Sequence, residues 1–340
     1  MKGQYMKDDE RNRIGIGLLF IIGIPLLAFL MVFSMGRGAT RIPADIIMSA
    51  ITDFNPDDVD HLIVRDLRIP RVLASALVGC ALAVAGAVMQ GVTRNEMADS
   101  GLMGLSAGAG LGLSIRYAFF PHLPYVWTIF ICFIGAAFAS ALTHGVSRIG
   151  HRNPSPMRLV LAGSAVSALL MALSQGTAVL FDVNQDIMFW TVGGVSAVSW
   201  EQVWVLLPTV LIPILLLNFI SGKISILSLG EETAVGLGIN TRRVFMLSSL
   251  YVVILAGVSV SVVGSVGFIG LMVPHMAKYL VGVDYRKLIP SSALLGAMLM
   301  VAADLGAKTI NPPYETPVGA VIALIGVPFF LYLANRKGRY

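Results

Sequence analysis

The sequence predicts an all-α integral membrane protein with about ten transmembrane helices, and three observations support this fold class. Of the 340 residues, 56% are hydrophobic and only 13% are charged, whereas a soluble domain carries about 25% charged residues. The charges are clustered, and the apolar runs between them reach about 20 residues, the length that crosses the hydrocarbon layer of a bilayer. The 35 glycines suit close helix packing in lipid. We therefore expect one transmembrane domain, residues 1–340, embedded in a lipid bilayer.

Each expected span is a helix, because backbone polar groups in lipid must be bonded within their own segment. The first follows a basic N-terminal stretch, and its apolar run, residues 14–33, is too long for a signal peptide, so we interpret it as a membrane span. In chain order, the expected spans are residues 14–34, 70–91, 98–116, 124–147, 157–180, 200–220, 242–262, 265–282, 287–308 and 316–334.

The second and third spans begin with distinctive sequences. Arg68-Ile69-Pro70-Arg71 opens the second span, and proline is typical of the first turn of a helix. The two arginines either anchor the helix at the interface by snorkelling or pair with acidic groups on an external partner. Small residues recur along residues 101–112 of the third span. They predict close helix contact, with the lining of a conduit as the alternative.

The loop at residues 227–241, between the sixth and seventh spans, is the longest expected cytoplasmic loop. Ser228 followed by Glu231 is a capping-box pattern that predicts the start of a short helix. Gly236 and Gly238 would end this helix within two turns, and Asn240 or Thr241 would cap the seventh span.

The short helix in this loop would present Ala234, Val235 and Leu237 as a small apolar face outside the membrane. Such a face is either a docking element for a cytoplasmic motor protein or part of an ordinary solvated loop helix. The pattern alone leaves both interpretations open.

The eighth and ninth spans differ from the others. The apolar stretch of the eighth, residues 266–273, stops at Pro274, so we expect a short or broken helix buried among its neighbours. In the ninth, Lys308 follows Asp304 by one helical turn, which predicts an ion pair that shields an intramembrane carboxylate.

The positions of lysine and arginine predict the orientation. With a cytoplasmic N-terminus, 17 of the 24 lysines and arginines fall on the cytoplasmic side, as the positive-inside rule requires, and both termini are cytoplasmic. Most of the exceptions lie between the first two spans. The seven basic residues on the outer side are Arg37, Arg41, Arg65, Arg68, Arg71, Arg116 and Lys308.

Several kinds of function find no support in the sequence. The net charge of +5 comes from short loops beside apolar runs, so nucleic acid is not an expected partner. There is no glycine-rich phosphate loop ending in Gly-Lys-Ser/Thr, so ATP binding by that route is not expected. The sequence shows neither a nucleophile–base pair nor a metal cluster, and we expect no cofactor and no enzymatic activity of its own. An ion- or proton-coupled secondary transporter remains the alternative to an ATP-driven one, although Asp304 is the only clear intramembrane acid.

Taken together, five blocks of the chain resemble the FecCD-type permeases of ATP-binding-cassette (ABC) importers for iron–siderophore complexes, haem and vitamin B12. The match covers nearly the whole chain. The blocks are Leu67–Gly91, Thr93–Gly110, Leu229–Asn240, Gly264–Lys308 and Glu315–Leu333.

This resemblance implies a ten-helix permease of the type II importer class in the bacterial cytoplasmic membrane. It implies a dimer, either of identical subunits or with a close relative, that sits on cytoplasmic ABC ATPase subunits. An extracytoplasmic solute-binding protein would deliver the solute, for which a ferric siderophore is the expected class.

The resemblance also implies residue roles. Arg68, Arg71 and Lys308 match basic positions that pair with acidic residues of the binding protein. Asn95 and Met97 match two positions of a cytoplasmic gate. The residues that would engage the ATPase are Gly230, Glu231, Glu232, Ala234, Leu237 and Gly238.

Two departures from the family pattern affect the gate. The family usually has Asn-Pro-Leu-Ala-Asp-Pro-Gly after the second span, but residues 95–101 of this chain lack both prolines. Pro156-Met157 stands where the vitamin B12 importer has a small polar pair. We expect a gate near these positions but assign no closure chemistry to it.

Overall fold

The computed structural model describes residues 2–38, 40–149, 156–312 and 314–337, and every regular element in these ranges is a helix. A helix occupies each of the ten expected positions. Seven helices are long and apolar enough to cross a membrane, and two shorter apolar helices accompany them. The ten helices are α1 (Lys2–Gly36), α4 (Ile69–Thr93), α5 (Leu105–Phe119), α6 (Tyr125–Ser147), α7 (Pro156–Leu180), α9 (Trp200–Leu229), α11 (Thr241–Val263), α12 (Ile269–Val281), α13 (Tyr285–Ile310) and α14 (Val318–Lys337).

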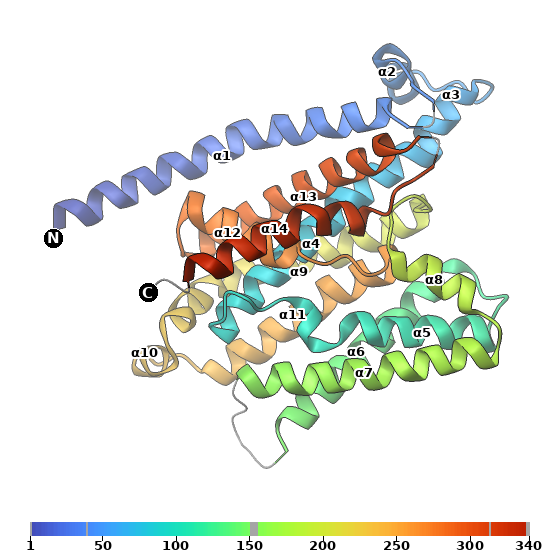
Figure 1. Ribbon diagram of the computed structural model, residues 1–340. Helices are drawn as coiled ribbons and strands as arrows, with labels where there is room; N and C mark the ends of the chain where they lie inside the picture. The colour runs from blue at the N-terminus through green and yellow to red at the C-terminus, as the bar shows by residue number, and fades with distance from the viewer. Residues whose placement is uncertain (1, 39, 150–155, 313, 338–340) are drawn as a thin grey trace.

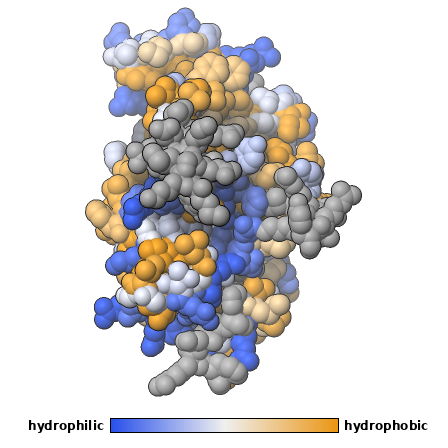
Figure 2. Space-filling view, turned by 90° about the vertical axis from the view of Figure 1, so that its left-hand side faces the viewer, coloured by the Kyte–Doolittle hydropathy of each residue, from blue (hydrophilic) through white to orange (hydrophobic). Residues whose placement is uncertain are grey.

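The ten helices form one bundle, and both ends of the described chain lie at the same end of it (Figure 1). Viewed from that end, hydrophilic residues occupy much of the middle of the surface, with hydrophobic residues above and below them (Figure 2). Large apolar side chains such as Phe29, Ile134 and Phe219 are exposed along the helices. Such a surface suits contact with lipid tails.

Helix α4 is the centre of the bundle, and glycines allow its closest contacts. A Cβ atom at Gly79 would lie 2.2 Å from the Gly296 carbonyl oxygen of α13, and one at Gly86 would lie 2.0 Å from the Gly270 carbonyl oxygen of α12. Neither position has room for a side chain, so the helices cross backbone to backbone.

The third expected span packs in the same way, which confirms the helix-contact interpretation of its small residues. A Cβ atom at Gly108 of α5 would lie 2.2 Å from the Gly135 carbonyl oxygen of α6. Helix α5 begins at Leu105, later than expected, because a 3₁₀ turn, η2 (Ser100–Met103), precedes it.

The eighth expected span is a short helix, but its break is not at Pro274. Helix α12 begins only at Ile269 and contains Pro274. Its 13 residues rise about 20 Å, less than the hydrocarbon thickness. The break lies at residues 264–268, where Gly264 and Phe268 have positive φ values of 75° and 67°. These left-handed conformations, rather than the proline, stop the helix.

Smaller helices that the sequence analysis did not identify cap the end opposite the termini. They are α2 (Ala44–Thr52), α3 (Val59–Leu62), the π-helix η1 (Ile63–Arg68) and α8 (Asn184–Val192). Helix α10 (Glu231–Gly236) lies at the end that carries the termini (Figure 1). We call the end with α10 the inner end and the end with α2, α3 and α8 the outer end.

Candidate functional sites at the two ends of the bundle

Helix α10 confirms the short helix expected in the 227–241 loop, although its cap is not the expected one. Helix α9 continues to Leu229, and the Ser228 hydroxyl donates to the Ser225 carbonyl within α9 instead of capping α10. The N-cap is Gly230, whose φ of 144° favours glycine.

The end of α10 and the start of α11 match the sequence analysis. Gly238, with φ 76°, follows the last turn of α10. Asn240 caps α11 by accepting a bond from the Arg243 N–H at 3.0 Å.

Helix α10 presents an apolar surface to its surroundings, but with one residue fewer than expected. Val235 and Leu237 are 59% and 63% exposed, whereas Ala234 is fully buried and anchors the helix to the bundle. Glu231 and Glu232 are exposed in the first turn, where the helix dipole favours negative charge. The exposed surface of α10 therefore combines two carboxylates with two large apolar side chains.

An ion pair connects α10 to the central helix α4. The Arg94 guanidinium Nη2 lies 3.3 Å from Glu231 Oε2, and both side chains are partly exposed. Arg94 is the C-cap of α4 and has φ 54°, a left-handed conformation that costs energy for a residue with a Cβ atom. Nothing in the sequence predicts this role of Arg94, because no local pattern pairs it with a residue 137 positions away.

The expected gate residues follow directly after Arg94. Asn95 is half-buried, and its Oδ1 accepts a bond from the Met97 N–H at 3.0 Å, which fixes a turn. Met97 is 48% exposed. Both residues line a cavity of about 420 Å³ at the inner end. Its lining is completed by Gln90, Arg94, Glu96, Ser228, Leu229, Lys278, Val283 and Tyr285.

Polar contacts fix one wall of this inner cavity. The Lys278 ammonium donates to Gln90 Oε1 at 2.9 Å, and the Gln90 amide nitrogen donates to the Gly270 carbonyl at 3.1 Å. The other expected gate position is Pro156-Met157. The structure describes the Met157 side chain, which is exposed. The Pro156 side chain lies outside the described set.

A buried charge cluster lies at the outer end. Two nitrogens of Arg71, Nε and Nη2, donate to Asp304 Oδ1 at 3.0 and 2.8 Å. The Lys308 ammonium lies 2.7 Å from Asp304 Oδ2, which confirms the ion pair predicted from their spacing. Lys308 also donates to the Ser34 hydroxyl at 3.2 Å, and Arg71 pairs with Glu315. The Asp304 carboxylate is fully buried, and a buried charge is tolerated only when it is paired in this way.

Arg68 lies at the same end but outside this charge cluster. Its guanidinium donates to the carbonyls of Met35 and Thr40 and to the Thr40 hydroxyl, so it holds the turn after α1. Arg68, Arg71 and Lys308 are all less than 10% exposed. Their expected contact with a binding protein stays a prediction, because each has an intramolecular partner in this conformation. Glu315 and Ser34 could not be identified from the sequence, because their pairing depends on tertiary contact alone.

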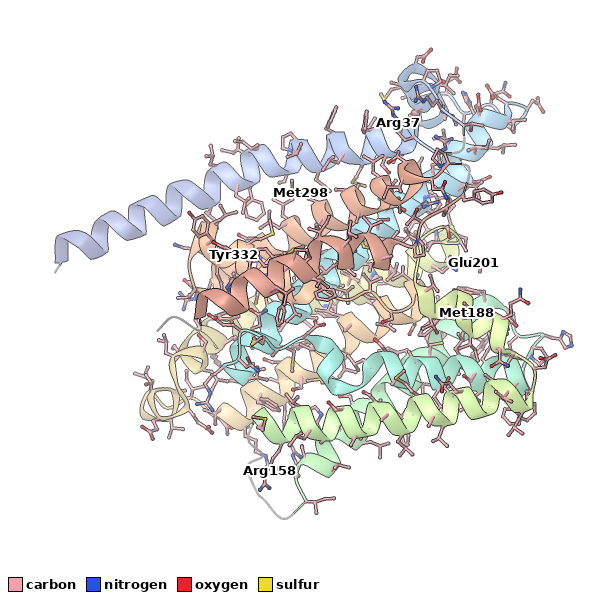
Figure 3. All side chains as sticks on the ribbon, viewed as in Figure 1. Arg37, Arg158, Met188, Glu201, Met298 and Tyr332 are labelled. Atoms are coloured by element: carbon pink, nitrogen blue, oxygen red, sulfur yellow. The ribbon has the colours of Figure 1, made fainter. Side chains whose placement is uncertain are left out.

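A second, larger cavity of about 690 Å³ opens at the outer end, and Arg71 and Glu315 stand in its wall. Met188, which lines the cavity, and Glu201, which follows the lining segment in the sequence, lie toward the same end as Arg37 (Figure 3). Arg158 and Tyr332 lie toward the other end (Figure 3). The remaining lining residues are Tyr117, Tyr125, Gln185, Asp186, Met188, Trp190, residues 192–198, Val262, Val263 and residues 316–318.

The described residues at the two ends form no metal centre. In the part of the chain that the structure describes, no three His, Cys, Asp or Glu residues come together in a way that could hold an ion. Arg71, Asp304 and Lys308 at the outer end and Arg94 and Glu231 at the inner end form ion pairs instead, an arrangement that suits packing and recognition.

Comparisons with known proteins agree with this architecture. The model of the FecCD transport family matches residues 26–336. The iron(3+)-hydroxamate import system permease protein FhuB of Bacillus subtilis is 44% identical over 96% of this chain and 85% of its own length. The Fe(3+)-citrate import system permease protein YfmD of the same organism is 41% identical over 95% of both chains. A solved structure described as an inward-facing metal-chelate type ABC transporter is similar at a TM-score of 0.82 and 26% identity, covering 94% of this chain and 99% of that one.

Proposed function

Because the chain belongs to the FecCD transport family, we propose that it is the permease subunit of an ABC importer that carries an iron–siderophore complex across the bacterial cytoplasmic membrane. The observation that carries this proposal is the exposed helix α10, which is joined to the central helix α4 by the Arg94–Glu231 ion pair. A transport path that another protein opens needs an exposed element on which that protein can act and that is connected to the path. Two curated relatives, named for ferric hydroxamate and ferric citrate import, support the choice of solute class.

ATP hydrolysis is assigned to separate cytoplasmic ATPase subunits, because the chain has no phosphate-binding loop. Val235 and Leu237 insert into a groove of the ATPase, and Glu231 and Glu232 flank them. Gly230 and Gly238 supply the positive φ values that set the angle of the helix. Ala234 acts from the other side, since its burial keeps α10 attached to the bundle.

Movement of α10 reaches the gate through Arg94. When the ATPases close, α10 shifts, and the ion pair displaces the C-terminus of α4 together with Asn95 and Met97. The inner cavity, which these residues line, opens or closes as the helices change between two packed arrangements.

The outer end receives the loaded solute-binding protein. Arg68, Arg71 and Lys308 are the proposed docking cations. Glu315 is the exchangeable partner, because its side chain is 45% exposed while Asp304 is fully buried. A carboxylate of the binding protein takes the place of Glu315 on Arg71, so docking leaves no buried charge unpaired and releases Glu315 to solvent.

The whole chain acts as one permease domain, and the functional unit contains two permease subunits, identical or closely related. Both termini are cytoplasmic in this proposal: the distribution of basic residues favours that side, and both ends of the described chain lie at the same end of the bundle (Figure 1).

Transport in reconstituted vesicles tests this function. The permease would be co-purified with its ATPase, inserted into liposomes and supplied with loaded binding protein and radioactive ferric siderophore. We expect iron uptake that requires ATP and that persists when a protonophore collapses the proton gradient. Uptake that needs no ATPase and follows the proton gradient would instead identify a secondary transporter.

A further inference from the structure

The outer cavity combines aromatic and acidic side chains. Tyr117, Tyr125 and Trp190 contribute aromatic rings to its wall, and Asp186 and Glu315 contribute carboxylates. Its volume of about 690 Å³ falls within the range of small-molecule sites, roughly 300–1,000 Å³. A compact iron chelate therefore fits the cavity by size.

The described residues that line this cavity include two acids, Asp186 and Glu315, and one base. Among the described residues that line the cavity, Arg71 is the one basic side chain, and it is paired with the buried Asp304 and with Glu315. A second cation, Arg116, lies behind the wall, with its guanidinium carbon 4.4 Å from the Tyr117 ring centroid, so the charge that faces the cavity without a partner is that of Asp186. Asp186 lies in the first turn of α8, is exposed, and forms no ion pair with a described residue. Its negative charge is therefore available to a molecule in the cavity.

We propose that this cavity is a charge-selective vestibule that admits neutral and cationic iron chelates in preference to anionic ones. Asp186 supplies the selecting charge, and the rings of Tyr125 and Trp190 provide surfaces for a cation or an apolar chelate backbone, whereas the Tyr117 ring already stacks with Arg116. This inference rests on the proposed function, and it narrows the solute class.

The net charge of a ferric complex depends on its chelating groups, so charge separates the classes of iron chelate. Three hydroxamate groups carry three negative charges, so they form a neutral complex with ferric iron, and a free amine on the same ligand makes the complex cationic. Complexes with citrate or with three catecholates keep a negative charge. The vestibule therefore favours trihydroxamates over ferric citrate and ferric catecholates.

One ferric chelate prepared in three charge states tests the vestibule, because the coordination of the iron is the same in all three. The probes are a linear ferric trihydroxamate with a terminal amine, its N-acetyl derivative and its N-succinyl derivative, which are cationic, neutral and anionic. Equilibrium binding of each probe, labelled with radioactive iron, would be measured on the full chain in lipid nanodiscs. We expect the cationic probe to bind about threefold to tenfold more tightly than the anionic one.

Asp186→Asn should reduce this preference and Asp186→Lys should reverse it, while affinity for the neutral probe stays within about twofold of the original. Asp45→Asn is the matched control, because Asp45 is an exposed carboxylate on α2 that does not line the cavity. Equal affinities for the three probes, or a preference that Asp186→Lys leaves unchanged, would refute the vestibule.

The outcome separates this inference from the proposed function. The ATP-driven complex could take up all three probes with charge preferences that do not depend on Asp186. That result would support the importer and refute the vestibule. Absence of uptake for every ferric siderophore would count against the importer itself.

Discussion

The two ends of the molecule use ion pairs in opposite ways. At the outer end, Arg71, Asp304 and Lys308 form a cluster in which the carboxylate has no exposed surface. At the inner end, Arg94 and Glu231 form a single pair, and their side chains are 39% and 48% exposed. A buried pair is costly to break, whereas an exposed pair contributes little to stability. The outer cluster therefore holds helices together, and the inner pair can break and re-form at a smaller cost.

The largest effect should come from removing the centre of the outer cluster. Asp304→Ala leaves Arg71 and Lys308 with a buried excess of positive charge, which typically costs about 3–5 kcal/mol. Thermal unfolding in detergent or nanodiscs should show a strongly destabilised protein. Glu231→Gln is the control at the other end, where the loss should stay below about 1 kcal/mol. Equal losses for the two variants would contradict the contrast between the ends.

The next largest effect should be the loss of the ATPase from the inner end. Val235→Asp combined with Leu237→Asp replaces exposed apolar surface on α10 by charge, so folding is spared while a groove in the partner loses its ligand. Burial of one such side chain is worth about 1.5–3 kcal/mol, so affinity should fall more than tenfold in a pull-down or titration. Met48→Asp, an equally exposed apolar residue on α2, should leave the complex intact. Normal association of the double variant would argue against docking through α10.

Exchange of the two charges at the inner end should change coupling more than stability. Arg94→Glu alone or Glu231→Arg alone places like charges together and separates α10 from α4, so ATP hydrolysis should continue while transport per ATP falls several-fold. The double variant Arg94→Glu with Glu231→Arg restores an attractive pair and should recover transport. Transport and hydrolysis would be measured together in vesicles.

A matched variant distinguishes the charge of Arg94 from its backbone conformation. Arg94→Gly relieves the left-handed conformation but removes the ion pair, so it should be stable and poorly coupled. Full transport by Arg94→Gly would mean that the ion pair does not transmit the movement.

The two ends also show which features the sequence could predict: those that depend on neighbouring residues along one helix. Apolar run lengths predicted a helix at each of ten positions, and the Asp304–Lys308 pair followed from helical periodicity. The capping-box prediction for α10 was wrong. Ser228 and Glu231 have the spacing of a cap, but Ser228 lies within α9 and its hydroxyl bonds to the Ser225 carbonyl. The sequence predicted the short helix α12 but not the position of its break, because Pro274 lies within the helix as its sixth residue and the break is at residues 264–268.

Long-range pairing accounts for the rest of what the sequence could not predict. The Glu315–Arg71 and Arg94–Glu231 pairs join residues 244 and 137 positions apart. No periodicity relates such residues, since they meet only because α4 lies at the centre of the bundle. The burial of Arg68 and Arg71 has the same origin, because their inward orientation depends on acceptors contributed by other elements.

The smallest effect on stability, and the most direct test of the outer end, should come from Glu315. Changing Arg71 to glutamate would disrupt the buried cluster, so a loss of docking there would not distinguish recognition from unfolding. Glu315→Gln leaves Asp304 in place and removes only the half-exposed partner of Arg71, with a stability cost below about 1 kcal/mol. If Arg71 exchanges Glu315 for a carboxylate of the binding protein, the variant has no competitor to displace and should bind that protein about twofold to fivefold more tightly at low salt. The gain should shrink as salt rises. Weaker docking by Glu315→Gln would show instead that Glu315 itself contacts the partner, and unchanged docking would confine Arg71 to the structural cluster.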